Sequence, residues 1–127
     1  MFVTVVVAAG LALAGSPGVS QAAGPSTGGQ RCTIVGSPGP DVLTGTAGRD
    51  VICGLGGNDR INGRAGDDVI AGGAGNDVID GGPGDDLVQG GPGNDTVRGA
   101  AGDDRLVGAS GHDRIFGEEG GRRRPRP

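Results

Sequence analysis

The sequence of 127 residues lacks tryptophan, tyrosine and lysine, and it has only two phenylalanines. Without large aromatic side chains, the chain has little bulk with which to build the core of an ordinary globular domain. The absence of lysine argues against a phosphate-binding loop, because no glycine-rich turn here ends in the required GK[ST] triplet. One histidine and two cysteines are too few to form the clusters that soft or redox-active metals select. No segment has the D-x-[DN]-x-[DN]-G spacing of an EF-hand.

What the sequence has in quantity is glycine, with 31 residues, and aspartate. All 13 aspartates lie between residues 36 and 116, together with six arginines, which gives this segment a net charge of −7 in a chain of net charge −4. A segment this acidic argues against nucleic-acid binding. It suits hard cations, which bind to carboxylate oxygens.

The N-terminal segment, 1–22, has the pattern of a secretory signal peptide. The apolar run from Phe2 to Ala14 is too short to span a bilayer, and Ser20-Gln21-Ala22 places small residues at the two positions that a signal peptidase reads. No basic residue precedes the run, so a retained anchor remains the alternative. We therefore expect residues 1–22 to be removed on export, a secreted product without a membrane span, and a Ser/Gly/Pro-rich leader over residues 23–35.

A strict nine-residue period begins at Gly36. Glycine recurs every nine residues from Gly39 to Gly120, and a second glycine series runs three residues earlier, from Gly36 to Gly117. In nine successive copies an aspartate follows the first series by two residues, and an aliphatic residue stands two residues further on. The motif aspartates are Asp41, Asp50, Asp59, Asp68, Asp77, Asp86, Asp95, Asp104 and Asp113. Four registers held over nine copies indicate a repeat protein over residues 36–116 and argue against a flexible linker, which needs no aliphatic residue in register.

Each nonapeptide predicts a glycine-rich turn followed by a three-residue strand. The glycines permit positive φ and tight turning, and the remaining three residues are too few for a helical turn. The middle strand residue is always aliphatic and faces opposite to its neighbours, so it points inward. Two nonapeptides make one 18-residue coil with a strand on each side. The sequence therefore predicts an all-β fold, a right-handed parallel β-roll with two sheets of short strands and a narrow aliphatic core.

The roll sends alternate turns to opposite edges. The first edge carries Asp41, Asp59, Asp77, Asp95 and Asp113, and the second edge carries Asp50, Asp68, Asp86 and Asp104. Carboxylates on one edge sit one coil apart, close enough to repel, and the glycine-rich turns leave backbone carbonyls free. Such a ladder of carboxylate and carbonyl oxygens offers the six to eight hard ligands that Ca²⁺ takes.

The copies "GGAGNDVID", "GGPGDDLVQ" and "GGPGNDTVR" closely resemble the GGxGxDxUx nonapeptide of RTX (repeats-in-toxin) calcium-binding proteins. The resemblance implies a calcium-bound β-roll in an exported bacterial protein. It also implies that the motif aspartates of two same-edge turns bridge each ion, which allows up to about seven Ca²⁺. Main-chain carbonyls would assist, at Gly54, Gly63, Gly72, Gly81 and Gly90.

The outer copies depart from this motif. They lose the second glycine of the GG pair at Ser37, Thr46, Leu55, Arg64, Ala100 and Ala109. We expect the outermost sites to be weaker than the central ones. His112 precedes a motif aspartate, where other copies have Asn or Asp, so we interpret it as a degenerate ligand position and not as a catalytic base.

Two features lie outside the repeats. Cys32 could fold back over the first coil and form a disulfide with Cys53, as a cysteine pair in an exported protein suggests. The alternative is that the two are unrelated small apolar side chains. Residues 117–127 form a degenerate repeat and a basic tail, read either as a solvated end or as a segment that binds an anionic polymer or lipid.

Val51, Val69 and Leu87 occupy the first, outward strand position on one sheet. This stripe indicates either ordinary β-propensity or a docking face for a protein or cell-surface partner. No nucleophile–base set is present, so we do not expect an enzyme. The sequence predicts calcium binding coupled to folding, with an adhesion or interaction scaffold as the alternative.

Overall fold

The computed structural model of the chain describes residues 26–27 and 30–117. The predicted signal peptide, 1–22, and the basic tail from residue 118 onward lie outside the described residues. The part of the chain that is described contains no helix long and apolar enough to cross a membrane.

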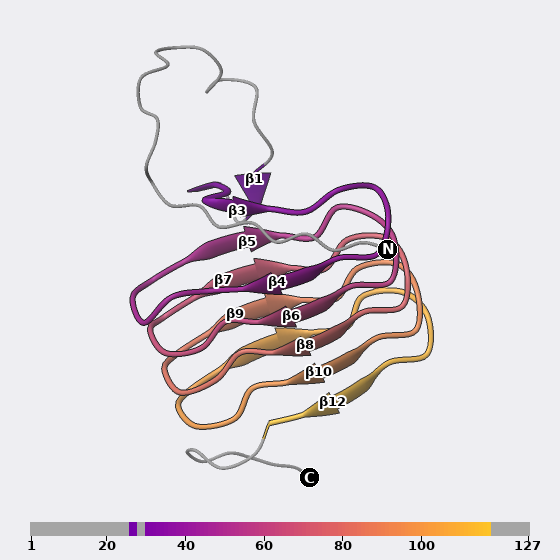
Figure 1. Ribbon diagram of the computed structural model, residues 1–127. Helices are drawn as coiled ribbons and strands as arrows, with labels where there is room; N and C mark the ends of the chain where they lie inside the picture. The colour runs from indigo at the N-terminus through magenta and orange to yellow at the C-terminus, as the bar shows by residue number, and fades with distance from the viewer. Residues whose placement is uncertain (1–25, 28–29, 118–127) are drawn as a thin grey trace, which may run out of the picture.

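Two five-stranded parallel sheets form the body of the structure, and their strands stack as successive coils (Figure 1). Each strand pairs in register with the strand two nonapeptides away, as Val42 with Arg60 and Val51 with Val69. The predicted parallel β-roll with two nonapeptides per coil is therefore confirmed. One sheet contains β4 (Val42–Thr44), β6 (Arg60–Asn62), β8 (Val78–Asp80), β10 (Thr96–Arg98) and β12 (Arg114–Phe116). The other contains β3 (Ile34–Val35), β5 (Val51–Cys53), β7 (Val69–Ala71), β9 (Leu87–Gln89) and β11 (Arg105–Val107).

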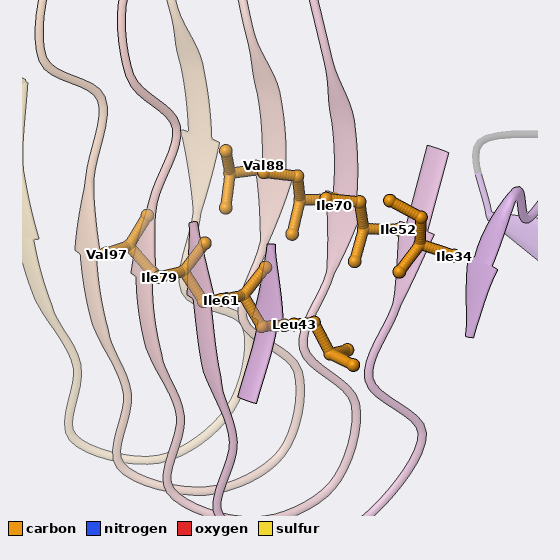
Figure 2. Packing of buried hydrophobic residues seen from close by; sticks show 8 residues of the cluster. All are labelled: Ile34, Leu43, Ile52, Ile61, Ile70, Ile79, Val88 and Val97. Atoms are coloured by element: carbon orange, nitrogen blue, oxygen red, sulfur yellow. The ribbon is translucent and has the colours of Figure 1, made fainter. Parts of the chain in front are cut away.

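The core is a double row of aliphatic side chains, one from each successive strand. Figure 2 shows Ile34, Ile52, Ile70 and Val88 in one row and Leu43, Ile61, Ile79 and Val97 in the other. All eight are at most 3% exposed. The rows end at the C-terminal coil, where Leu106 is partly buried and Ile115 is 45% exposed, because no further coil of the described chain covers it.

The first rung of the core lies ahead of the repeats counted in the sequence. Ile34 in β3 pairs with Ile52 and is 1% exposed. It stands one nonapeptide before Leu43, in register with the aliphatic series, but no glycine–aspartate turn precedes it. The roll thus begins inside the segment 23–35 that the repeat pattern left outside it.

The turns keep one backbone shape even where the second glycine is missing. Gly73 and Gly75 of a central turn have φ of 95° and 116°. Leu55, Arg64, Ala100 and Ala109 occupy the position of Gly73 in other turns and have φ of 72–77°. A left-handed conformation costs a non-glycine residue about 1–2 kcal/mol, so the fold imposes this shape against local preference. Ser37 and Thr46 are the exceptions, since neither has positive φ.

A short hairpin covers the outer face of the second sheet at its N-terminal end. Strands β1 (Ser26–Thr27) and β2 (Gln30–Arg31) pair antiparallel, and β1 contacts β5 and β7. A disulfide joins Cys32 to Cys53 in β5, which ties this segment to the sheet. Cys53 is 3% exposed.

This cover changes the predicted docking stripe. Val51 and Val69 do point away from the core, but each is only 6% exposed. Leu87, one coil further on, is 38% exposed. The predicted face of Val51, Val69 and Leu87 is therefore wrong as an open surface, because the preceding segment of the same chain lies over its first half.

The middle and the open end of the core make a matched test of packing. We expect Ile70→Ala to lower the free energy of unfolding by about 2–5 kcal/mol, since a fully buried side chain leaves a cavity. Ile115→Ala, at the open end, should change it by about 0.5 kcal/mol or less. Denaturant unfolding in saturating calcium measures both. Equal losses at the two positions would contradict a core that ends at Leu106.

Candidate metal centre

The motif aspartates stand immediately before the strands, and their main chains are held in register by the sheets. Each carbonyl of Asp41, Asp59 and Asp77 accepts the N–H of the first strand residue one coil later, at 2.8–2.9 Å. The N–H of every motif aspartate except the last on each edge donates to the Oδ1 of the next aspartate on its edge. Seven such bonds of 2.8–2.9 Å link Asp41 through Asp113 on the first edge and Asp50 through Asp104 on the second. The structure therefore brings all nine predicted aspartates into two ladders.

The second carboxylate oxygen of most motif aspartates is buried without a partner. A buried oxygen that accepts no hydrogen bond costs several kcal/mol when it carries charge. The side chains themselves are no more than 6% exposed from Asp41 to Asp95. Among the described residues, the unpartnered Oδ2 atoms belong to Asp59, Asp68, Asp77, Asp86, Asp95 and Asp104.

Glycine carbonyls face these unpartnered oxygens. A side chain on Gly63 would place its Cβ 2.7 Å from both Asp68 Oδ2 and the carbonyl oxygen of Gly81 in the next coil. The same small space recurs over Gly54, between Asp59 Oδ2 and the Gly72 carbonyl. Within the described chain, the carbonyls of Gly54, Gly63, Gly72 and Gly81 accept no backbone hydrogen bond, whereas that of Gly90 accepts one from Gly73. Carboxylate and carbonyl oxygens thus converge where the glycine leaves room.

Burial raises the pKa of the interior carboxyls. The pKa of Asp59 and of Asp86 rises from 3.8 to about 7, and that of Asp68 and of Asp77 to about 6. Desolvation is the main cause, a backbone hydrogen bond from the aspartate one coil earlier opposes it, and repulsion from same-edge carboxylates adds to it. The pKa of Asp95 and of Asp104 is raised for the same first reason. Burial thus disfavours the charged form of these groups, which a neighbouring cation would favour.

The donor set suits a hard cation. In the described part of the chain, no three acidic, histidine or cysteine side chains gather around one point. A cation held here would therefore take part of its shell from oxygens other than those of side chains, such as main-chain carbonyls or water. A mixed shell of carboxylate and carbonyl oxygens is typical of Ca²⁺ and unlike the sulfur and imidazole ligands of Zn²⁺.

A second, exposed ladder of opposite direction runs outside the first. Asn58 and Asn76 accept on Oδ1 the N–H of the equivalent residue one coil later, and so does Asn94 from His112. On the second edge, Asp67 and Asp85 do the same. The first edge thus carries amides where the second edge carries carboxylates. These outer charges reach the inner ladder, since Asp67 raises the pKa of Asp68 and of Asp86.

The first turn of each edge is built differently. The N–H of Ser37 donates to Asp41 Oδ2 at 2.5 Å, and its hydroxyl lies 3.0 Å from both carboxylate oxygens. Thr46 makes the same three contacts with Asp50, at 2.6, 3.1 and 3.0 Å. The sequence showed these two residues only as departures from the motif. The feature of the sequence that could have identified them is a hydroxyl at this position in the first turn of each edge and in no other repeat.

Stacked coils with carboxylate ladders along both edges define a β-solenoid of the cation-binding kind. A family model for the RTX calcium-binding nonapeptide repeat (four copies) matches residues 33–61, 54–88 and 89–121. The matched segments cover most of the chain, which therefore belongs to the RTX calcium-binding repeat family. A search of curated proteins and a search of solved structures returned no match.

Without calcium, the fold should be more stable in mild acid than at neutral pH. Because the folded-state pKa of Asp59, Asp68, Asp77 and Asp86 lies above 3.8, the stabilising contribution is present below about pH 4 and is lost as pH rises through about 6–7. We expect the β-signal in far-UV circular dichroism, recorded in chelator, to increase from pH 7.5 to pH 5. Saturating calcium should reverse the trend, since calcium must displace protons.

The matched control is Asp59→Asn with Asp86→Asn, because an amide does not titrate. In this variant the pH dependence in chelator should be flatter than in the unaltered chain. If the unaltered chain in chelator is equally stable at pH 5 and at pH 7.5, the pKa values of the interior carboxyls are not raised.

The outer ladders should tune affinity. We expect Asp67, Asp85 and Asp103 replaced together by Asn to weaken calcium binding at the second edge, by up to about fivefold per charge at low salt. The reciprocal change, Asn58, Asn76 and Asn94 to Asp, should strengthen the first edge. Calcium titrations at low and high sodium chloride measure both. Because exposed charges are screened, a difference that persists undiminished at high salt would contradict this explanation.

Proposed function

We propose that this chain is an exported module whose β-roll folds when calcium enters the two aspartate ladders. The observation that supports this most directly is the six buried Oδ2 atoms without partners, three on each edge. Ionised carboxylates stacked in this way oppose folding, and a divalent cation between them removes the penalty. The core offers little compensation, since its buried cluster contains one aliphatic side chain per strand.

In this proposal each ion lies between two neighbouring turns of one edge. Asp77 would share ions with Asp59 and Asp95, and Asp86 with Asp68 and Asp104. Carboxylates come from both turns, and the glycine carbonyls that face them complete part of the shell, at Gly54, Gly63, Gly72, Gly81 and Gly90. The arrangement explains why the first glycine of each turn has no side chain, because a Cβ would occupy the same space.

Several features favour action outside the cell. Extracellular calcium is abundant, so a chain that needs calcium to fold would stay unfolded until export. The disulfide between Cys32 and Cys53 is a bond that persists in oxidising compartments. The pattern of residues 1–22 fits an export signal.

An interaction scaffold is the weaker alternative. On the face expected to bind a partner, Val51 and Val69 are buried under a segment of the same chain. Only Leu87 of the three is exposed. We propose no catalysis, because a repeat β-solenoid of this family is a structural fold.

A calcium titration of the full chain, followed by far-UV circular dichroism, tests the proposal. We expect a disordered spectrum in chelator at pH 7.5 and a β-spectrum in millimolar calcium, with magnesium much less effective because it prefers a smaller octahedral shell with several waters. Asp77→Asn with Asp86→Asn should raise the calcium midpoint by about tenfold or more, because these two carboxylates border four of the spaces between turns.

Asp80→Asn is the matched control. Asp80 lies on β8 and belongs to neither ladder, so its replacement should leave the midpoint within about twofold. A spectrum that is the same in chelator and in calcium would overturn the proposed function. So would an equal response to magnesium.

A further inference from the structure

The two turns that begin the ladders differ from the turns that follow them in three respects. Ser37 and Thr46 lack the positive φ found at the same position in the following turns. Gly39 and Gly48 also lack it, although Gly57 and Gly66 have it. Both buried carboxylates, Asp41 and Asp50, are fully hydrogen-bonded, whereas the next six have a bare Oδ2.

We infer that the first turn of each edge is a hydroxyl-closed cap that takes the place of a calcium site, so that the calcium rows begin one coil later. This inference rests on the proposed function and specifies which of the predicted spaces between turns take an ion. It assigns Ser37 and Thr46 as the residues that decide where the rows start.

The position of the caps explains why a hydroxyl is needed there. In the interior, each Oδ1 accepts the N–H of the aspartate one coil earlier, as Asp59 does from Asp41. Asp41 and Asp50 have no earlier motif aspartate on their edges, so their Oδ1 atoms would lack this donor. The hydroxyls of Ser37 and Thr46, at 3.0 and 3.1 Å, lie where they can supply it.

The same turns also occupy the oxygen that a cation would use. In the caps the N–H groups of Ser37 and Thr46 point at Oδ2, the atom that stays bare in the interior. An N–H dipole aimed at this atom places positive charge where a cation would bring its own. The hydroxyl oxygens then accept the N–H of Gly39 and of Gly48, both at 3.1 Å, which holds the cap conformation.

Neighbouring residues agree with this assignment. The residue before the motif aspartate is Asn or Asp in the next turns but is Pro40 and Arg49 in the caps. Arg49 lowers the pKa of Asp68, so its positive charge acts on the first space of the second edge. The outer ladder likewise starts only at Asn58 and Asp67.

If the caps take no calcium, five spaces remain. Each of these spaces lies between two aspartates that are joined by a hydrogen bond from main chain to carboxylate. The first such pair on each edge is left out because it contains the cap. The remaining pairs are Asp59–Asp77, Asp77–Asp95, Asp95–Asp113, Asp68–Asp86 and Asp86–Asp104.

Counting bound ions in the full chain tests the inference. Equilibrium dialysis against calcium, with the metal measured by atomic emission, should give about five ions per chain, one for each of these pairs. Asp41→Asn with Asp50→Asn should leave this number unchanged, because an amide can keep the hydroxyl and N–H contacts of the cap. Asp77→Asn with Asp86→Asn, the matched pair from the interior, should lower it.

Rebuilding the caps as interior turns provides the opposite change. In the variant Ser37→Gly, Pro40→Asn, Thr46→Gly and Arg49→Asp, the first turn acquires the sequence GGPGND of residues 90–95, and the second becomes GGAGDD, which has the GGxG[ND]D pattern of the central turns. We expect two further ions, one for each opened space, with circular dichroism in calcium used to verify that the variant folds. If it does not fold, the comparison of the two Asp→Asn pairs decides alone.

The outcomes distinguish a failure of the caps from a failure of the calcium-dependent fold. Seven ions in the unaltered chain, or a loss of ions in Asp41→Asn with Asp50→Asn, would overturn the caps and leave the calcium-dependent fold standing. A folded rebuilt variant that binds no additional ions would also overturn the role of Ser37 and Thr46. If the unaltered chain binds no calcium, the proposed function is wrong. The caps then cannot be substitutes for calcium either.

Discussion

The burial of stacked carboxylates, which costs desolvation and adds mutual repulsion, is the constraint on which the rest of this structure depends. The strand that follows each motif aspartate fixes its main chain, and hydrogen bonds to the neighbouring coils fix its position along the edge. The side chain therefore cannot turn outward to water. Asp59, Asp77 and Asp95 are therefore stacked at a spacing set by the strands. Under the proposed function, sheet formation and charge neutralisation are one event, because the hydrogen bonds that order the strands also bring the charges together.

The turns serve this constraint more than they serve local preference. Leu55 and Arg64 are held in a left-handed conformation that they would not choose, while glycine remains wherever a Cβ would meet a carboxylate and a carbonyl. The core is narrow, with one aliphatic side chain per strand, and its rows follow the period that the turns set. A fold of this kind places its specificity in the edges and not in the interior.

Most of the architecture could be predicted from the sequence because the period of nine and the alternation within three-residue strands leave little choice. The pairing of each strand with the one two nonapeptides away, and the inward rows from Leu43 to Val97, follow from these two regularities. The place of Ile34 in the core was not predicted, because Ile34 is in register with the aliphatic series but is not preceded by the turn motif. The cover over Val51 and Val69 depends on a non-repeating segment, whose position no period describes. The hydroxyl contacts of Ser37 and Thr46 required the geometry of an edge with no preceding coil.

The alternation between Asn58, Asn76 and Asn94 on one edge and Asp67, Asp85 and Asp103 on the other gives the chain a parity. Gain or loss of one nonapeptide would move every later unit to the opposite sheet and mix amides with carboxylates along both edges. Gain or loss of a whole coil would keep each later unit on its sheet and keep amides and carboxylates on separate edges. The alternating pattern therefore marks the pair of nonapeptides, not the single one, as the unit by which such a chain can lengthen or shorten without exchanging its two sides.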